Sequence, residues 1–252
     1  MKRSSSFYHA FFFTCCLFVS AGLYAQTTET ADKPIFPSSW VAGTVVDAAV
    51  VSGYGIDKCF VAETISDEVF ARMWNKSYKK GCPVPREQLR YLKVLHRNAE
   101  GNIQLGEMVC NAIIADKLVR IFRSLYDAGY KIESMRLVDD FNADDDLSMK
   151  ANNTSCFNYR PVPGTQHLSN HAKGLALDLN PLYNPFVRTR NGVTEVLPKT
   201  GRKYAFNRAT RKDIPYKIDR NDLAYKKFIA EGFNWGGAWR TMKDYQHFEF
   251  KQ

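Results

Sequence analysis

The sequence predicts an α+β fold in which a central antiparallel sheet is flanked by helices. Its candidate elements follow one another in the order strands, helix, strands, helix, strand. This order favours antiparallel strands with helices packed against them. The 252 residues, 45% of them hydrophobic and 24% charged, suit one globular domain with a substantial core, with or without a small extension.

The first residues have the composition of a secretory signal peptide. Lys2 and Arg3 precede the uncharged run 11–19, and small residues lead to a cleavage position after Ala25. The run is shorter than the roughly 20 apolar residues that a membrane-spanning helix needs. We therefore expect residues 1–25 to be removed and the protein to be exported to the periplasm or cell envelope, without stable membrane insertion.

The mature chain is predicted to be basic. Residues 1–25 hold two of the 35 basic residues and none of the 26 acidic ones, so their removal leaves a formal charge of +7. Basic proteins are attracted to anionic polymers, and an anionic cell envelope fits the export signal. The chain lacks the interleaved arginines and aromatics of nucleic-acid binders, so no nucleic acid is expected as a partner.

Cysteine usage predicts a disulfide. Four cysteines remain after residue 25, namely Cys59, Cys82, Cys110 and Cys156. An even number in an oxidising compartment favours at least one bridge, although the sequence does not choose among the three pairings. The spacing contains no CxxC motif, which argues against a metal site built from cysteines.

In the first half, residues 26–39 form a predicted flexible leader and residues 40–86 an extension packed on the main domain, residues 87–252. Within the extension, Ser66 caps a predicted helix that runs to about Gly81. Residues 89–97 and 103–109 then predict a pair of strands joined by a turn.

A long amphipathic helix is predicted from Asn111 to Ala128. Its apolar face combines Ile113, Ile114, Leu118, Ile121, Phe122 and Leu125, and Gly129 ends it. Residues 132–141 then predict a strand, and the acidic stretch around 144–146 a solvated loop. That stretch lacks the glycine and distal glutamate of a calcium loop.

Residues 181–217 predict a long excursion with little periodicity. Arg188, Arg190 and Arg202 either line a cationic groove or are simply solvated, and solvated loop charge is the favoured reading. Asp219 is expected to cap a helix that stops at Gly232, and the chain ends in the strand DYQHFEF.

Two predicted strands bring together residues that bind metals. In GLALDLN the leucines alternate with Asp178, which places the leucines in the core and Asp178 on the opposite face. His171 precedes this strand within reach of that face. In DYQHFEF, Phe248 and its neighbour two residues on are expected in the core, with His247 and Glu249 on the other side. The pattern alone leaves a metal site and incidental histidines equally open.

The two motifs resemble those of a known family. SNHAKGLALDLN is similar to the Ser-x-His-x-x-Gly-x-Ala-x-Asp signature of the D-alanyl-D-alanine carboxypeptidase family of zinc peptidases. DYQHFEF resembles the closing Asp/Glu-x-x-His motif of that family, in the form found in phage L-alanyl-D-glutamate endolysins. The likeness covers about residues 87–252 and implies the fold shared by these peptidases and the hedgehog signalling domain.

The resemblance also implies roles for individual residues. His171, Asp178 and His247 would bind one zinc ion (Zn²⁺), and Asp244 would be the catalytic base, with Glu249 a candidate to orient a ligand histidine. The arginine that steadies the reacting carbonyl in this family has no clean counterpart, and the nearest is Arg160. The implied function is hydrolysis of peptidoglycan stem peptides by a D-alanyl-D-alanine carboxypeptidase. The alternatives are an endopeptidase of the L-Ala-D-Glu type and a non-catalytic module that holds zinc.

Overall fold

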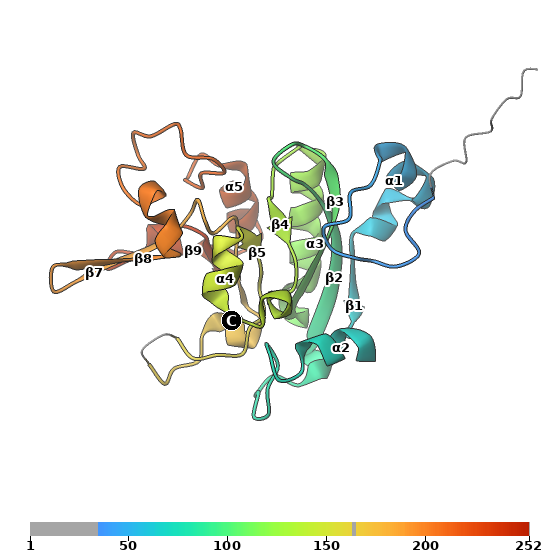
Figure 1. The fold of residues 1–252 in the computed structure, drawn as a ribbon, viewed down its shortest axis with the longest axis horizontal. Helices are drawn as coiled ribbons and strands as arrows, with labels where there is room; N and C mark the ends of the chain where they lie inside the picture. Colours follow the sequence, from blue (N-terminus) through green and yellow to red (C-terminus); the bar gives the residue numbers. More distant parts are fainter. Residues whose placement is uncertain (1–34, 163–164, 252) are drawn as a thin grey trace, which may run out of the picture. The chain divides into compact units, whose positions relative to one another are not determined.

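The chain contains five α-helices and eleven strands within residues 35–162 and 165–251, which the computed structural model describes (Figure 1). The predicted α+β class is confirmed. The predicted signal peptide, residues 1–25, lies outside the described residues. The helices are α1 Ala48–Tyr54, α2 Asp67–Met73, α3 Ala112–Asp127, α4 Asp145–Lys150 and α5 Leu223–Ala230, with 3₁₀ turns η1 Ile56–Cys59, η2 Arg86–Gln88, η3 Val138–Phe141, η4 Asn170–Lys173, η5 Lys199–Tyr204 and η6 Gly236–Ala238. The strands are β1 Val61–Thr64, β2 Leu89–Arg97, β3 Ile103–Asn111, β4 Ser134–Met135, β5 Asn153–Thr154, β6 Ala176–Asp178, β7 Phe186–Arg190, β8 Val193–Leu197, β9 Phe233–Trp235, β10 Lys243–Asp244 and β11 His247–Phe250.

The antiparallel strands are divided among three small sheets instead of one central sheet. Their orders are β1-β2-β3, β10-β7-β8 and β6-β11-β9, and β4 pairs with β5 in parallel. The predicted strand pair is β2–β3, with Leu92 opposite Met108. Within the described part of the chain, no helix is long and apolar enough to cross a membrane.

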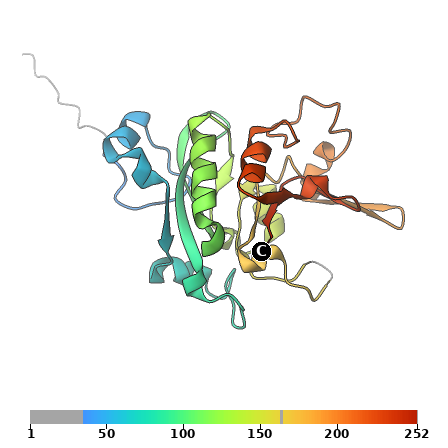
Figure 2. The same ribbon diagram turned by 180° about the vertical axis from the view of Figure 1, so that it is seen from behind.

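Helix α3 forms as predicted and packs against the β1-β2-β3 sheet (Figure 2). The Asn111 side chain accepts a hydrogen bond from the Ile113 amide at 3.1 Å and so caps the helix. Ile114, Leu118 and Phe122 are buried, whereas Ile113, predicted on the same face, is half exposed because it shares a helix face with Lys117 and Arg120, four and seven residues on. The helix thus supplies one wall of the main core.

The same core supports the strands that carry the candidate ligands. The Phe228 ring of α5 stacks on Phe248 of β11 with centroids 4.3 Å apart and meets Phe122 of α3 edge-on. Leu177 of β6 and Phe248 are fully buried. Since successive strand residues face opposite sides, these anchors turn the neighbouring Asp178 and His247 to the other face.

An ion pair between a half-buried arginine and a buried carboxylate joins the extension to β3. Arg72 of α2 donates to Glu107 at 2.9 and 2.5 Å, and the Tyr91 hydroxyl donates to the same carboxylate at 2.6 Å. Glu107 is only 1% exposed. In addition, β1 pairs with β2, so residues 35–252 form one compact unit. The division at residue 86 stays a prediction.

The predicted lengths of two elements were wrong for identifiable reasons. Helix α2 begins after Ser66 as predicted but ends at Met73, because Asn75 adopts a left-handed conformation with φ of 63°. The strand predicted at 132–141 shrinks to β4 because the Asn153 amide pairs with the backbone N–H and C=O of Arg136, where a neighbouring strand would lie. The next residues form the 3₁₀ turn η3.

The acidic stretch predicted as a loop is the start of α4. The Asp144 carboxylate accepts from the Leu147 amide at 3.0 Å, and Lys150 pairs with Asp146 one turn away. Acids at a helix N-terminus cap it and interact favourably with its dipole. The cluster of acids is therefore explained by the helix.

The long excursion contains a hairpin, β7–β8, that the sequence analysis missed. Asn191 and Gly192 connect its strands with φ of 51° and 75°. An Asn-Gly pair favours this two-residue turn because both positions need positive φ. Further along, Asp222, not Asp219, caps α5 by accepting from the Tyr225 amide.

The predicted disulfide is contradicted. Cys59, Cys82, Cys110 and Cys156 are all unpaired in the described part of the chain. Cys59, Cys110 and Cys156 are buried in the main core among apolar side chains. Burial raises the pKa of the Cys59 thiol to about 11, so it stays protonated and unreactive at neutral pH.

His96 makes the stability of the fold sensitive to acid. Burial lowers its pKa from 6.5 to about 4, against the opposing effect of the hydrogen bond with the Ile132 carbonyl. The neutral ring therefore stabilises the fold fully above pH 6.5, and this contribution is lost as the pH falls towards 4. We expect the free energy of unfolding of wild type to fall by about 3 kcal/mol more than that of His96→Gln over this range, as measured by urea unfolding. Parallel pH profiles of the two proteins would contradict this.

Candidate metal centre

His171, Asp178 and His247 meet at one point, although they come from three elements. His171 lies in η4, Asp178 ends β6 and His247 begins β11. Strands β6 and β11 pair with Asp178 directly opposite His247, which confirms the predicted neighbourhood of the two strands. The ligand roles of the three residues stay predictions.

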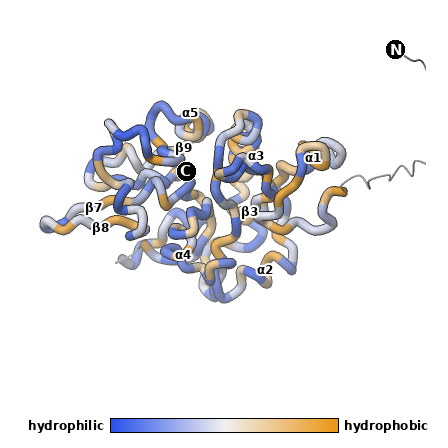
Figure 3. Tube along the Cα trace, turned by 45° about the horizontal axis from the view of Figure 1, so that its top comes forward, coloured by the Kyte–Doolittle hydropathy of each residue, from blue (hydrophilic) through white to orange (hydrophobic). Residues whose placement is uncertain are grey.

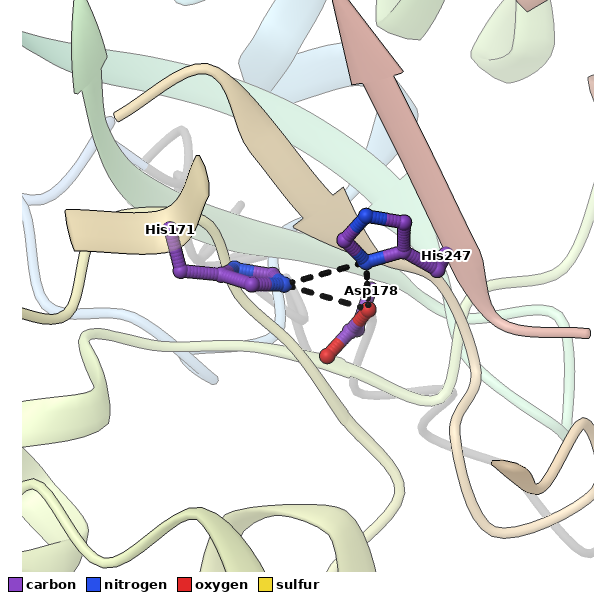
Figure 4. Close-up of side chains that lie close together, drawn as sticks. All are labelled: His171, Asp178 and His247. Carbon is purple, nitrogen blue, oxygen red and sulfur yellow. Dashed lines mark hydrogen bonds and ion pairs between the residues drawn. The ribbon is translucent and has the colours of Figure 1, made fainter. Parts of the chain in front are cut away.

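The three side chains point their donor atoms at one another (Figure 4). His171 Nε2 lies 3.2 Å from His247 Nδ1 and 3.4 Å from Asp178 Oδ1. His247 Nδ1 and Asp178 Oδ1 are 3.2 Å apart. The three donor atoms all lie within 4.8 Å of one another. Two imidazoles and one carboxylate with this convergence are a donor set that zinc accepts, with a fourth position left for water.

A short turn fixes the position of His171. The Ser169 hydroxyl accepts a hydrogen bond from the His171 amide, and Gly174 ends η4 with φ of 67°. A Cβ at Gly174 would lie 2.7 Å from the Asn111 amide nitrogen, so only glycine fits there. The Gly174 carbonyl in turn accepts from that amide at 2.9 Å. The glycine of the motif thus presses η4 against the end of β3.

Partners of the imidazoles favour the tautomers that a metal needs. His171 Nδ1 lies 2.7 Å from the Cys156 carbonyl oxygen, which can only accept, so Nδ1 carries the proton and Nε2 presents its lone pair to the site. His247 Nε2 lies 3.6 Å from Glu249 Oε2. Asn170 donates to the same Glu249 oxygen at 2.7 Å. Glu249 therefore lies where it attracts a proton to Nε2 and leaves Nδ1 free for a metal.

The charged groups of the site shift one another's pKa values. Burial alone would raise the pKa of Asp178, but His171 and His247 together hold it well below its usual range. Burial would lower the pKa of His247, yet Asp178, Glu249 and Asp244 raise it to about 10. These three carboxylates stabilise positive charge at this point, which is what a divalent cation would supply.

Glu249 should support metal binding from outside the donor set. We expect Glu249→Ala to weaken zinc affinity about 10–100-fold, because His247 loses the acceptor for its second ring nitrogen. Glu249→Gln keeps an acceptor oxygen and should lose less. Competition with a chromogenic chelator measures both, with the exposed Glu100→Ala as the control. Equal zinc affinity in Glu249→Ala and the control would show that Glu249 has no such role.

Asp244 lies beside the three residues but does not join them. It ends β10, and its charge interacts with those of His247 and Asp178. Its Oδ1 is buried and has no hydrogen-bond partner among the described residues. Burial raises the pKa of Asp244 to about 6, with His247 acting in the opposite direction. A carboxylate with this pKa is ionised at neutral pH and still basic enough to take up a proton.

Gly236, which the sequence analysis did not single out, fixes this arrangement. A Cβ on Gly236 would lie 2.8 Å from the Cβ of Asp244 and 3.2 Å from that of His247. Any larger residue would push one of them away. The sequence signal for Gly236 is the Gly-Gly pair between Trp235 and Trp239.

Arg160 is engaged elsewhere in this structure. Its Nε forms an ion pair with Asp145 of α4, and Nη1 donates to the Pro161 carbonyl at 3.4 Å. Only its backbone is tied to the site, since its carbonyl accepts from the Ser169 amide. Its predicted role at the reacting carbonyl stays a prediction, and it requires the guanidinium to leave Asp145.

Comparison with known families supports the resemblance seen in the motifs. Residues 163–250 match the model of a D-alanyl-D-alanine carboxypeptidase family. The match includes the three candidate ligands and Asp244 but not Arg160, and it is shorter than the likeness expected from residue 87 onwards. Searches of curated proteins and of solved structures found no significant match.

Proposed function

From the match of residues 163–250 to the D-alanyl-D-alanine carboxypeptidase family, we infer that this peptidase uses one zinc ion to hydrolyse peptidoglycan stem peptides. We propose that it removes the terminal D-alanine. The observation that carries the proposal is the convergence of His171, Asp178 and His247 beside a buried carboxylate, Asp244. A module that merely holds zinc has no need for this fourth group.

The residues present suit zinc in three respects. The donor atoms converge, both histidines have partners for their other ring nitrogens, and Asp178 is held ionised by its neighbours. When bound in such a site, zinc polarises the scissile carbonyl and makes water nucleophilic at neutral pH. The four identified side chains would then divide the work between binding the metal and moving a proton.

Asp244 is the group that moves the proton. Its unpartnered Oδ1 is available to accept a hydrogen bond from the attacking water and then its proton, as the water oxygen forms a bond with the carbonyl carbon. When the C–N bond breaks, Asp244 returns this proton to the leaving amine nitrogen. His171, Asp178 and His247 hold their places throughout, because β6–β11 pairing and the η4 turn fix them.

An endopeptidase that cuts the L-Ala-D-Glu bond is the second candidate. One observation favours it: the residue three positions before His247 is aspartate, as in the phage endolysins that the closing motif resembles. Both reactions use the same catalytic groups. They differ only in whether the substrate continues beyond the scissile bond.

The test is incubation of the zinc-loaded protein with purified muropeptides, followed by mass spectrometry of the products. Loss of one alanine from pentapeptide stems is the expected result, whereas release of stem peptides that begin at D-Glu, with L-Ala left on the glycan, would identify the endopeptidase. Zinc content is measured in parallel for wild type and His171→Ala, and the variant should lose stoichiometric zinc. If protein that contains zinc cleaved no muropeptide, the proposed peptidase activity would be refuted.

Export to the periplasm or cell envelope is part of the proposal, since the substrate lies there. It is supported by the composition of residues 1–25. Sequencing the N-terminus of the protein recovered from the envelope fraction tests it, with a start after Ala25 as the expected result. Recovery from the cytoplasm with residues 1–25 intact would contradict export.

A further inference from the structure

The positive charge of the protein is concentrated in one segment beside the site. Residues 186–220, here called the basic segment, contain ten lysines and arginines and three acidic residues, a formal charge of +7. The remainder of residues 35–252 carries only +1. Figure 3 colours much of the chain between β8 and α5 in the blue of hydrophilic residues.

Most of these cations are free to bind a partner. Within the basic segment, three cations form ion pairs with its three acids and Arg208 is buried. The other six side chains are exposed, and none of them pairs with a carboxylate of residues 35–162 or 165–251. They are Arg190, Lys199, Arg202, Lys203, Lys212 and Arg220.

Arg208 holds the basic segment together. Its guanidinium donates to the Tyr183 and Tyr204 carbonyls at 2.7 and 2.9 Å and to the Asn184 side chain at 2.7 Å. It also lies over the Tyr245 ring, 4.3 Å from the centroid. Buried without a carboxylate partner in the described chain, Arg208 serves as an internal clamp. The exposed cations are consequently displayed on an ordered surface.

The basic segment is attached directly to the strand of the proposed base. Its first strand, β7, pairs with β10, with Phe186 opposite Asp244 and Val187 opposite Lys243. A ligand held along the basic segment would therefore reach the catalytic residues without leaving the surface of the protein.

We propose that the basic segment is a docking surface for the intact, carboxylate-bearing glycan–peptide polymer, so that the site acts on polymer held at a distance from the scissile bond. This inference rests on the proposed function. One exposed ion pair contributes little to binding. Six cations become effective together only when the ligand repeats its charge along a chain, as a polymer with a carboxylate on every stem does. A free stem peptide is too short to engage them.

The test is co-sedimentation of the full mature protein with insoluble peptidoglycan sacculi. Asp244→Asn serves as the background, so that the polymer is not consumed. The variant Arg190→Glu/Lys199→Glu/Lys212→Glu changes three exposed side chains that make no hydrogen bond or ion pair within residues 35–162 and 165–251. We expect its affinity for sacculi at low salt to fall about tenfold or more. Thermal unfolding verifies that the variant is folded.

A second triple variant controls for net charge. Lys58→Glu/Lys80→Glu/Lys226→Glu makes the same change in charge at exposed lysines outside the basic segment. We expect it to sediment with sacculi like the unmodified background protein. Amidation of the sacculus carboxylates should weaken binding of the background protein to the level of the first variant, since the partner groups are then neutral.

The outcomes separate this inference from the proposed function. Equal binding of both triple variants to sacculi would overturn it, as would unchanged binding to amidated sacculi. Loss of DNA binding by the first variant, with binding to sacculi intact, would overturn it in favour of a nucleic-acid partner. If binding depended on the basic segment but the wild type cleaved no muropeptide, the docking surface would be supported and the proposed peptidase activity refuted.

Discussion

Asp244→Asn is expected to lower kcat for peptide hydrolysis about 10²–10⁴-fold, while the protein keeps its zinc and its fold. Asparagine has nearly the same shape, so it fits against Gly236, but it cannot take up a proton from water. Asp244 is also outside the set of converging donor atoms, so Asp244→Asn keeps all three candidate ligands. Steady-state kinetics on a soluble stem peptide, together with metal analysis, measure both effects.

A comparison with His171→Ala sharpens this test. That variant should lose activity together with zinc, whereas Asp244→Asn should lose activity alone. If Asp244→Asn retained wild-type kcat, the proton would have to move through another group. Glu249, which lies on the same strand face as His247, would then be the next candidate.

Arg72→Met is expected to lower the free energy of unfolding by about 1–3 kcal/mol, because the carboxylate that it leaves is buried although Arg72 itself is 36% exposed. It leaves the Glu107 carboxylate, 1% exposed, without its cation and with only the Tyr91 hydroxyl as a side-chain donor. Removal of one member of a buried pair costs far more than the pair itself contributes, because the remaining charge stays out of water. Equilibrium unfolding in urea measures the change.

Two further variants make the cause identifiable. Arg72→Met/Glu107→Gln also removes the charge of the unpaired carboxylate and should recover a large part of the lost stability. Arg188→Met breaks an exposed pair with Glu195 and should cost no more than about 1 kcal/mol. If Arg72→Met were as mild as Arg188→Met, the pair of Arg72 and Glu107 would not be the link that we describe.

Much of the geometry of the candidate metal centre could be predicted from the sequence, because strand alternation is a local rule. The leucines of GLALDLN and Phe248 identify the core face, and the opposite parity of Asp178 and His247 follows from them. Parity alone would have favoured Glu249 as the base. The structure instead places Glu249 beside His247 Nε2. Asp244, three residues before His247, has an oxygen without a hydrogen-bond partner in the part of the chain that the structure describes.

The remaining features depend on contacts between distant parts of the chain. The acids of α4 were misinterpreted because a side-chain cap and a solvated loop have the same composition. The hairpin β7–β8 was predictable from Asn191-Gly192, a signal that was overlooked. By contrast, no local sequence pattern predicts that Arg72 pairs with Glu107 or that Gly236 packs against Asp244.

The hydrogen bond between His171 and the Cys156 carbonyl limits how far the site can be transplanted. The segment that matches the family model begins at residue 163, so the carbonyl oxygen that sets the protonated nitrogen of His171 lies upstream of it. The Asn111 amide, which fixes Gly174, lies further upstream still. Grafted alone into another scaffold, the matched segment would carry all the donor atoms of the site. It would lose the hydrogen bond that orients the His171 ring. The part of the chain that is needed to form the candidate site is consequently longer than the segment that matches the family.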